Sequence, residues 1–154
     1  MADPLPNRAG LIVFNRAGQV LVCSSLIRSN IWVFPKGHIE PNEASYEAAE
    51  RECVEETGVY AVVDSSVPLL SQTYTYQNED VIVEWWTGLA VKLQHEKWKD
   101  TGRVVRWVPP TQALELLSFA ALRNALRAAL CLDEEETITG AVILTDAREE
   151  VSTK

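Results

Sequence analysis

The sequence predicts one domain of mixed α/β class, of the α+β type, and three observations lead to this prediction. A chain of 154 residues is long enough for a single domain with a substantial core. Its composition, 47% hydrophobic and 23% charged, is that of an ordinary globular protein. A helical pattern over residues 42–58 is preceded and followed by short apolar runs that are typical of strands.

A hairpin is the first regular structure that the sequence predicts. Two apolar runs are separated by Asn15-Arg-Ala-Gly18, where Gly18 suits the positive φ angle of a tight turn. The segments predicted before the helix are, in order, a loose leader over residues 1–8, strands over 10–14 and 20–24, a polar loop over 25–30, and a strand over 31–34 that Pro35 ends.

The predicted helix has signals at both ends. Asn42 suits the N-cap, and Glu43 in the first turn would favour the positive end of the helix dipole. Gly58 is typical of the residue that ends a helix, because glycine accepts a left-handed conformation. We therefore expect the helix to start after Asn42 and to stop at Gly58.

The second half of the chain predicts further strands and then helix. Residues 77–80 are expected to form the turn of a second hairpin. The predicted segments are strands over 59–63, 71–76, 81–93 and 103–108, a surface loop over 92–100, one or two helices within 111–132, and a C-terminal extension over 133–154 with a candidate strand over 137–145. The whole chain, 1–154, is expected to be one domain.

Glutamates crowd the predicted helix. Glu52, Glu55 and Glu56 fall at i, i+3 and i+4, so they share one helical face. Like charges at this spacing repel, and each pair destabilises an isolated helix by roughly 0.2–0.5 kcal/mol. Bound divalent cations would remove the conflict, so we interpret this face as a metal site. The alternative is a solvated acidic face.

The segment before the helix suits a phosphate chain. Lys36 and His38 supply donors, and Gly37 lets a ligand approach the backbone closely. Mg²⁺ takes about six oxygen ligands, usually one or two carboxylates together with substrate phosphates. Arg51 can pair with a glutamate one turn away and hold its carboxylate in place. For Lys36 and His38 the alternative is an ordinary surface role.

The stretch from Gly37 to Val59 resembles the Nudix box, G-x5-E-x7-R-E-U-x-E-E-x-G-U, where U is a bulky aliphatic residue. The residues that match in register are Gly37, Glu43, Arg51, Glu52, Glu55, Glu56, Gly58 and Val59. Cys53 departs from the pattern at the first U position. It is small but apolar, so we expect slightly looser packing and no loss of chemistry.

The resemblance implies a Nudix fold, an α/β/α sandwich with a mixed central sheet. It also implies hydrolysis of a nucleoside diphosphate linked to a further group, with Mg²⁺ or Mn²⁺ as cofactor. The implied metal ligands are the carboxylates of Glu52, Glu55 and Glu56 and the carbonyl of Gly37. Arg51 and Glu43 are implied to orient the loop and the helix.

Three glutamates stay open as the general base, because Nudix subfamilies draw it from different places. Glu55 in the helix is our first choice. Glu96, in the polar loop before the 103–108 strand, is where some relatives place a catalytic carboxylate, and its alternative is a solvated loop residue. Glu84 is a lone charge in an apolar run.

The residues that flank the box narrow the range of candidate substrates. Residues 32–43 resemble the W-x-x-P-K-G-H-x-E-P-G-E run of diadenosine tetraphosphate hydrolases and related polyphosphate hydrolases, with Asn42 in place of the glycine. Tyr74, Tyr76 or a tryptophan of the next strand are candidates to stack on adenine, although alternating aromatics also pack sheet faces. The alternatives within the family are diphosphoinositol polyphosphates, nucleotide sugars and oxidised nucleoside triphosphates. A different class is a non-catalytic, nucleotide-binding Nudix domain.

Charge and composition exclude several other classes. A net charge of −8 counts against broad nucleic-acid binding and against the highly charged diphosphoinositols. The sequence has no run approaching the ~20 apolar residues of a membrane span, and no signal-peptide core at its start. The cysteines at 23, 53 and 131 form no zinc or disulfide pattern. We therefore expect a cytoplasmic monomer or homodimer that acts on a small molecule.

Overall fold

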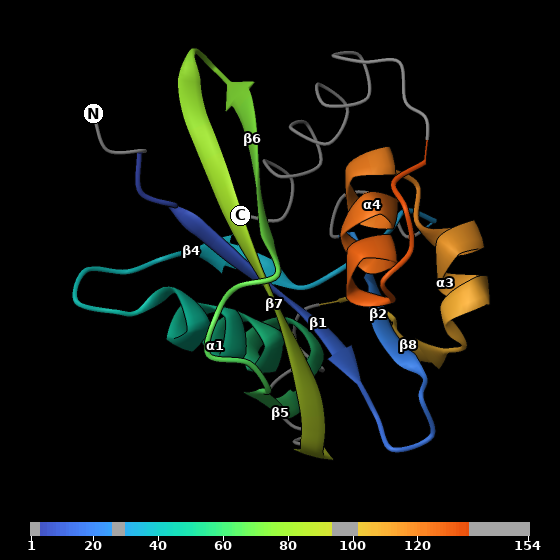
Figure 1. Cartoon of the computed structure of the whole chain (residues 1–154). Coiled ribbons are helices and arrows are strands. Elements are labelled where there is room, and N and C mark those ends of the chain that lie inside the picture. Colours follow the sequence, from blue (N-terminus) through green and yellow to red (C-terminus); the bar gives the residue numbers. More distant parts are fainter. Residues whose placement is uncertain (1–3, 26–29, 94–101, 136–154) are drawn as a thin grey trace.

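A computed structural model of the chain describes residues 4–25, 30–93 and 102–135 (Figure 1). The elements are β1 (Arg8–Phe14), β2 (Val20–Ser24), β3 (Trp32–Val33), β4 (Lys36–His38), α1 (Ser45–Thr57), β5 (Val59–Val63), β6 (Leu70–Tyr76), β7 (Glu79–Leu93), β8 (Val105–Val108), α3 (Pro110–Leu116) and α4 (Ala120–Ala129). Among the described residues, no helix is long and apolar enough to cross a membrane.

The strands form one mixed sheet. Its main order is β3-β2-β1-β7-β5, while β4 pairs with β1, β6 with β7 and β8 with β2. The central pair β1 and β7 is parallel, and the other pairs are antiparallel. This confirms the prediction of a mixed sheet.

Helices cover both faces of the sheet, which gives the predicted α/β/α layers (Figure 1). Alternate residues of β1 point to opposite faces, so Leu11 and Val13 pack beneath α1 while Ile12 packs on the side of α3 and α4. The two neighbouring tryptophans of β7 divide in the same way: Trp85 lies in the α3/α4-side core and Trp86 in the α1-side core. Both are buried, and neither presents its ring at the surface.

Several predicted boundaries need correction. The turn of the second hairpin is shorter than the predicted 77–80, because Glu79 and Asp80 already belong to β7. The leader ends earlier than residue 8, because Arg8 is already in β1 and Asn7 exchanges hydrogen bonds with the backbone of Asp80 and Ile82. Residues 36–38 form a strand that the sequence did not predict, since β4 pairs with the first half of β1. The last strand begins at Val105, two residues later than predicted.

The helical region of residues 111–132 divides into α3 and α4. Leu117 leaves the helical conformation, with φ −63° and ψ 122°, and it bridges to Trp32. Both helices still bury apolar residues against the sheet, among them Ala113 and Leu126. The predicted strand over 137–145 and most of the predicted loop over 92–100 lie outside the described residues.

Candidate active site

The helix that carries the glutamates begins two residues later than predicted, at Ser45. Asn42 is not its N-cap: it has a φ of +66°, a left-handed conformation that asparagine tolerates better than most residues. The N-cap is Ala44, whose N–H donates to the Glu47 carboxylate at 2.8 Å. Glu43 therefore precedes the helix instead of lying in its first turn. Gly58 ends α1 with a φ of +74°, as predicted.

Position 37 requires a glycine because the Glu52 carboxylate lies against it. A Cβ atom at position 37 would meet the Glu52 Oε2 atom at 2.1 Å, far inside van der Waals contact. Glu52 is 1% exposed, so its carboxylate is pressed between α1 and β4. The glycine thus makes room for a protein carboxylate, in addition to the ligand approach that the sequence predicted.

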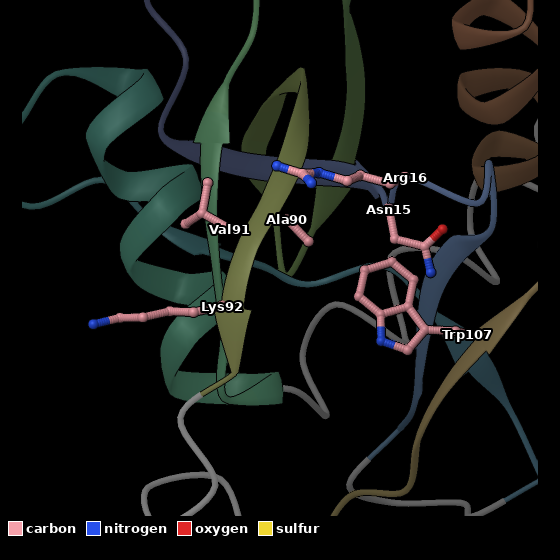
Figure 2. Close-up of a pocket in the computed structure, with 6 residues that line it drawn as sticks. All are labelled: Asn15, Arg16, Ala90, Val91, Lys92 and Trp107. Atoms are coloured by element: carbon pink, nitrogen blue, oxygen red, sulfur yellow. The ribbon is translucent and has the colours of Figure 1, made fainter.

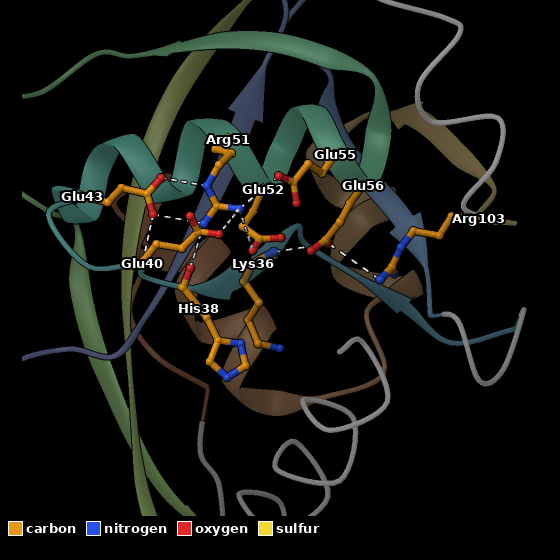
Figure 3. A network of polar contacts seen from close by, with 9 residues as sticks. All are labelled: Lys36, His38, Glu40, Glu43, Arg51, Glu52, Glu55, Glu56 and Arg103. Carbon is orange, nitrogen blue, oxygen red and sulfur yellow. Dashed lines mark hydrogen bonds and ion pairs between the residues drawn. The ribbon is translucent and has the colours of Figure 1, made fainter.

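Arg51 joins the helix to the segment that precedes it (Figure 3). Its guanidinium donates to Glu43 at 2.7 and 3.0 Å, to Glu52 at 3.3 Å, to Glu55 at 3.1 Å and to the carbonyl of His38 at 2.9 Å, and it lies 3.8 Å from Glu40. The hydrogen bond with Glu43 raises the pKa of Arg51 further above its ordinary value, and the same bond lowers the pKa of Glu43.

Glu56 lies at the other end of the row of carboxylates and has its own cation. It is 6% exposed, and its Oε1 atom accepts the N–H of Lys36 at 3.4 Å. The guanidinium of Arg103 lies 3.9 Å from the same oxygen (Figure 3). Glu55 differs from both neighbours, because its side chain is 51% exposed.

The carboxylates share one side of α1 but do not meet at one point. In the part of the chain that the structure describes, no three His, Cys, Asp or Glu side chains are grouped as metal ligands would be. Electrostatics accounts for this, because like charges separate and turn to the nearest cations. Glu52 and Glu55 turn to Arg51, whereas Glu56 turns to Arg103 and also accepts the backbone N–H of Lys36.

The residues predicted to bind substrate fall into two groups. The His38 carbonyl accepts a hydrogen bond from Arg51 beside the carboxylates, but its exposed imidazole points away from α1 (Figure 3). Lys36 points to the same side as His38 (Figure 3), is only 5% exposed and is not an ordinary surface lysine. Tyr74 is 8% exposed and belongs to the α3/α4-side core, and Tyr76 packs against the same core. The sheet-packing alternative therefore describes Tyr74, whose ring is not available to stack on adenine.

The candidate general bases also differ in placement. Glu96 lies outside the described residues. Glu84 is half-buried on β7 and stands opposite Ala9, which in turn stands opposite Gly37. Directly opposite residues share a sheet face, so Glu84 lies on the α1 side, two strands or about 10 Å from Gly37. Glu55 lies on α1 itself.

Arg103 is the residue of this site that the sequence did not reveal. It precedes β8 by two residues and lies 47 positions from Glu56 (103 minus 56), so no local spacing connects them. A basic residue at the start of a predicted strand is a weak signal, because such positions are commonly solvated. Pairing of β8 with β2 is what brings it beside α1.

A surface depression of about 550 Å³ lies elsewhere, beside the β1–β2 turn and the end of β7 (Figure 2). Its lining includes Arg16, Lys92 and Trp107. Figure 2 shows Arg16 reaching toward Ala90, whereas Lys92 points away from the depression. The ammonium of Lys92 lies instead over the ring of Tyr60, at 4.8 Å. None of the predicted site residues lines this depression.

The chain is similar to known proteins in sequence and in fold. The family model described as NUDIX domain matches residues 4–129. Nudix hydrolase 12, mitochondrial, of Arabidopsis thaliana is 32% identical over 143 residues, which cover 88% of this chain and 69% of that protein. An RNA pyrophosphohydrolase of Bartonella bacilliformis is 40% identical over 67 residues, 38% of this chain and 39% of that protein. The crystal structure of a C. elegans Ap4A hydrolase binary complex superposes with a TM-score of 0.64 at 22% identity, covering 82% of this chain and 96% of that one.

Proposed function

Because the chain belongs to the Nudix hydrolase family, whose members are generally pyrophosphohydrolases, we propose that it is a metal-dependent hydrolase of a nucleoside polyphosphate. Our first candidate substrate is a diadenosine polyphosphate such as diadenosine tetraphosphate. The observation that carries the reaction class is the acidic side of α1, held in place by Arg51 and Arg103 (Figure 3).

The proposed metal ligands fit Mg²⁺ or Mn²⁺ in their chemistry. Glu52, Glu55, Glu56 and the carbonyl of Gly37 are all hard oxygen donors, which these ions prefer. Three of these donors lie on α1, whose position is fixed by Ala48, Ala49 and Cys53 in the core. When bound, a divalent ion neutralises charge on the phosphate oxygens.

The protein's own groups would then direct a water molecule at phosphorus. We propose that Glu55 accepts a proton from this water, because it is the most exposed of the three α1 carboxylates. The water oxygen forms a bond to phosphorus, the anhydride P–O bond breaks, and the departing phosphate keeps the bonding electron pair. Arg51 orients Glu55 and Glu52, and Glu96 and Glu84 remain the alternative bases.

Several features support a polyphosphate substrate. The run from Trp32 to Glu43 resembles that of diadenosine tetraphosphate hydrolases, and a fold neighbour is an Ap4A hydrolase. His38 is exposed and follows Gly37 directly, and its imidazole can donate to a phosphate. A second candidate is the 5′ end of an RNA, because several relatives are named RNA pyrophosphohydrolases. We propose the cytoplasm as the compartment, although the Arabidopsis relative is named mitochondrial.

A substrate panel tests this proposal. Diadenosine polyphosphates, 5′-triphosphate RNA, capped RNA, nucleotide sugars, diphosphoinositols and oxidised nucleoside triphosphates would be incubated with the protein and Mg²⁺, and products separated by anion-exchange chromatography. We expect the highest kcat/KM for a diadenosine polyphosphate. A preference for triphosphate RNA would replace the first candidate with the second.

Two controls decide whether α1 carries the reaction. In Glu55→Gln, kcat should fall by orders of magnitude while the fold persists, because the carboxylate acts in the transition state. Excess EDTA should abolish turnover. Tight binding of one panel member without any hydrolysis would instead identify a non-catalytic nucleotide-binding protein.

A further inference from the structure

Arg103 places a fixed positive charge beside one proposed metal ligand. Its side chain is 1% exposed, and its Nη2 atom lies 3.9 Å from Oε1 of Glu56, whose side chain is 8% exposed. A carboxylate that has left water needs a cation or several donors close by. Within α1, Arg51 contacts Glu52 and Glu55, so it is already committed to the other two ligands.

The position of Arg103 does not depend on Glu56 alone. Its Nη1 atom donates to the carbonyl of Ser24 at 2.8 Å. Ser24 also binds Val104, the residue after Arg103. The Ser24 N–H donates to the Val104 carbonyl at 2.9 Å, and the Ser24 Oγ accepts the Val104 N–H at 2.9 Å. The end of β2 therefore fixes the guanidinium at a set distance from α1.

A fixed guanidinium and a divalent cation both stabilise the same carboxylate, and they repel each other. We propose that Arg103 is the counter-ion of Glu56 and competes with the divalent cation for it. This inference rests on the proposed metal site. Arg103 is then a positioning residue: it neutralises the buried carboxylate of Glu56, and for that reason it lowers the affinity of the site for the divalent cation.

Thermodynamic linkage predicts the direction in which removal of Arg103 changes the affinity for the metal ion. If Arg103 neutralises Glu56, its removal leaves a buried carboxylate without that cation, and a bound metal ion supplies the missing charge. Metal binding should therefore become tighter in Arg103→Met, and the metal should stabilise this variant more than the wild type. If Arg103 only ties β8 to β2 through Ser24, the loss of stability would be the same with and without metal.

The experiment compares Arg103→Met with a matched control, Arg123→Met. Arg123 also pairs with a glutamate, Glu135 at 2.9 Å, and also donates to a backbone carbonyl, that of Leu117 at 2.9 Å. Mn²⁺ affinity would be measured by titration calorimetry, and the melting temperature in EDTA and in Mn²⁺. We expect Arg103→Met to bind Mn²⁺ more tightly, on the order of tenfold, and Arg123→Met to match the wild type. Arg103→Lys should retain most of the wild-type affinity.

A double variant keeps the test decisive if Arg103→Met does not fold in EDTA. Glu56→Gln removes the charge that needs neutralising, so Glu56→Gln/Arg103→Met should be more stable in EDTA than Arg103→Met alone. Unchanged or weaker Mn²⁺ binding in Arg103→Met, or no rescue by Glu56→Gln, would overturn the inference. Failure of the wild type to bind any Mn²⁺ would count against the proposed metal site itself, and the rescue in EDTA would still report on the ion pair.

Discussion

The pair of Glu43 and Arg51 makes the stability of this protein depend on pH. Glu43 accepts two hydrogen bonds from Arg51 at 2.7 and 3.0 Å, and its side chain is 15% exposed. The fold therefore favours the charged carboxylate and lowers its pKa below the ordinary 4.5. A lowered pKa stabilises the fold above the unfolded-state pKa, and this contribution is lost as the pH falls through the folded-state value.

Glu43→Gln should consequently destabilise the protein near neutral pH and much less in acid. We expect the free energy of unfolding to fall by roughly 1.5–3 kcal/mol at about pH 7, the range for hydrogen bonds to charged groups. The difference from wild type should shrink as the pH decreases below 4.5, because Glu43 then becomes protonated in both states. Urea denaturation at several pH values measures this.

Glu47→Gln is the control for that series. Glu47 is exposed and accepts the Ala44 N–H, a bond that glutamine can also accept. Its effect should be small and nearly independent of pH. A constant gap between Glu43→Gln and wild type across the acid range would contradict the assignment.

At the scale of elements, the contact between β4 and α1 sets the position of a proposed ligand. Gly37 is buried in β4, and the Glu52 carboxylate occupies the space that a side chain at 37 would take. Strand and helix can therefore approach this closely only while residue 37 lacks a Cβ atom. The sequence matched this glycine to the Nudix box but did not reveal that a carboxylate fills the space.

Gly37→Ala should push Glu52 out of its place. We expect a stability loss of roughly 1–3 kcal/mol, as for other overpacked sites, together with a loss of hydrolytic activity. Gly18→Ala is the comparison: its φ of +77° strains an alanine, but no atom lies within 4 Å of the added carbon. It should lose stability while keeping activity. Equal activity in both variants would show that the position of Glu52 does not matter to the reaction.

At the scale of the whole molecule, the three cysteines lie in three different places: one in the core on each side of the sheet, and one at the surface. Cys23 lies in the α3/α4-side core, Cys53 in the α1-side core, and Cys131 is exposed. Burial raises the pKa of the Cys23 thiol and raises that of Cys53 to about 12. Both therefore remain unreactive thiols at neutral pH, because the thiolate is the reactive form.

Iodoacetamide should accordingly label one cysteine in the folded protein and three after denaturation. Intact mass followed by peptide mapping should place the single adduct on Cys131. Labelling of Cys53 in the folded state would mean that α1 separates from the sheet. Labelling of Cys23 would mean the same for the opposite layer.

Local spacing explains how much the sequence could predict. The carboxylates of α1 and the stop at Gly58 depend on residues within one turn or two, so the pattern reveals them. The strands of β1, β2, β5 and β7 follow from their own apolar runs. Asn42 was assigned wrongly because an asparagine suits both an N-cap and a left-handed turn, and only the path of the chain decides between them.

Long-range pairing explains the rest. The β4 strand has only three residues, and it forms because it pairs with β1. The composition of such a short segment does not predict this pairing. Arg103 reaches Glu56 only through the pairing of β8 with β2. The alternating pattern around Tyr74 is the same whether its ring faces a ligand or the core. Only its burial in the structure shows that the ring faces the core.

The parallel pairing of β1 with β7 has a consequence for how the chain acquires its structure. Asn7 accepts a hydrogen bond from Ile82, 75 positions away, at the start of this ladder. A chain made from its N-terminus therefore presents β1 and the apolar side of α1 long before β7 arrives to complete the sheet. Such distant contacts slow folding, and the unfinished edge of β1 is open to wrong partners during synthesis. The arrival of β7 thus sets the time at which the sheet beneath the acidic helix is completed.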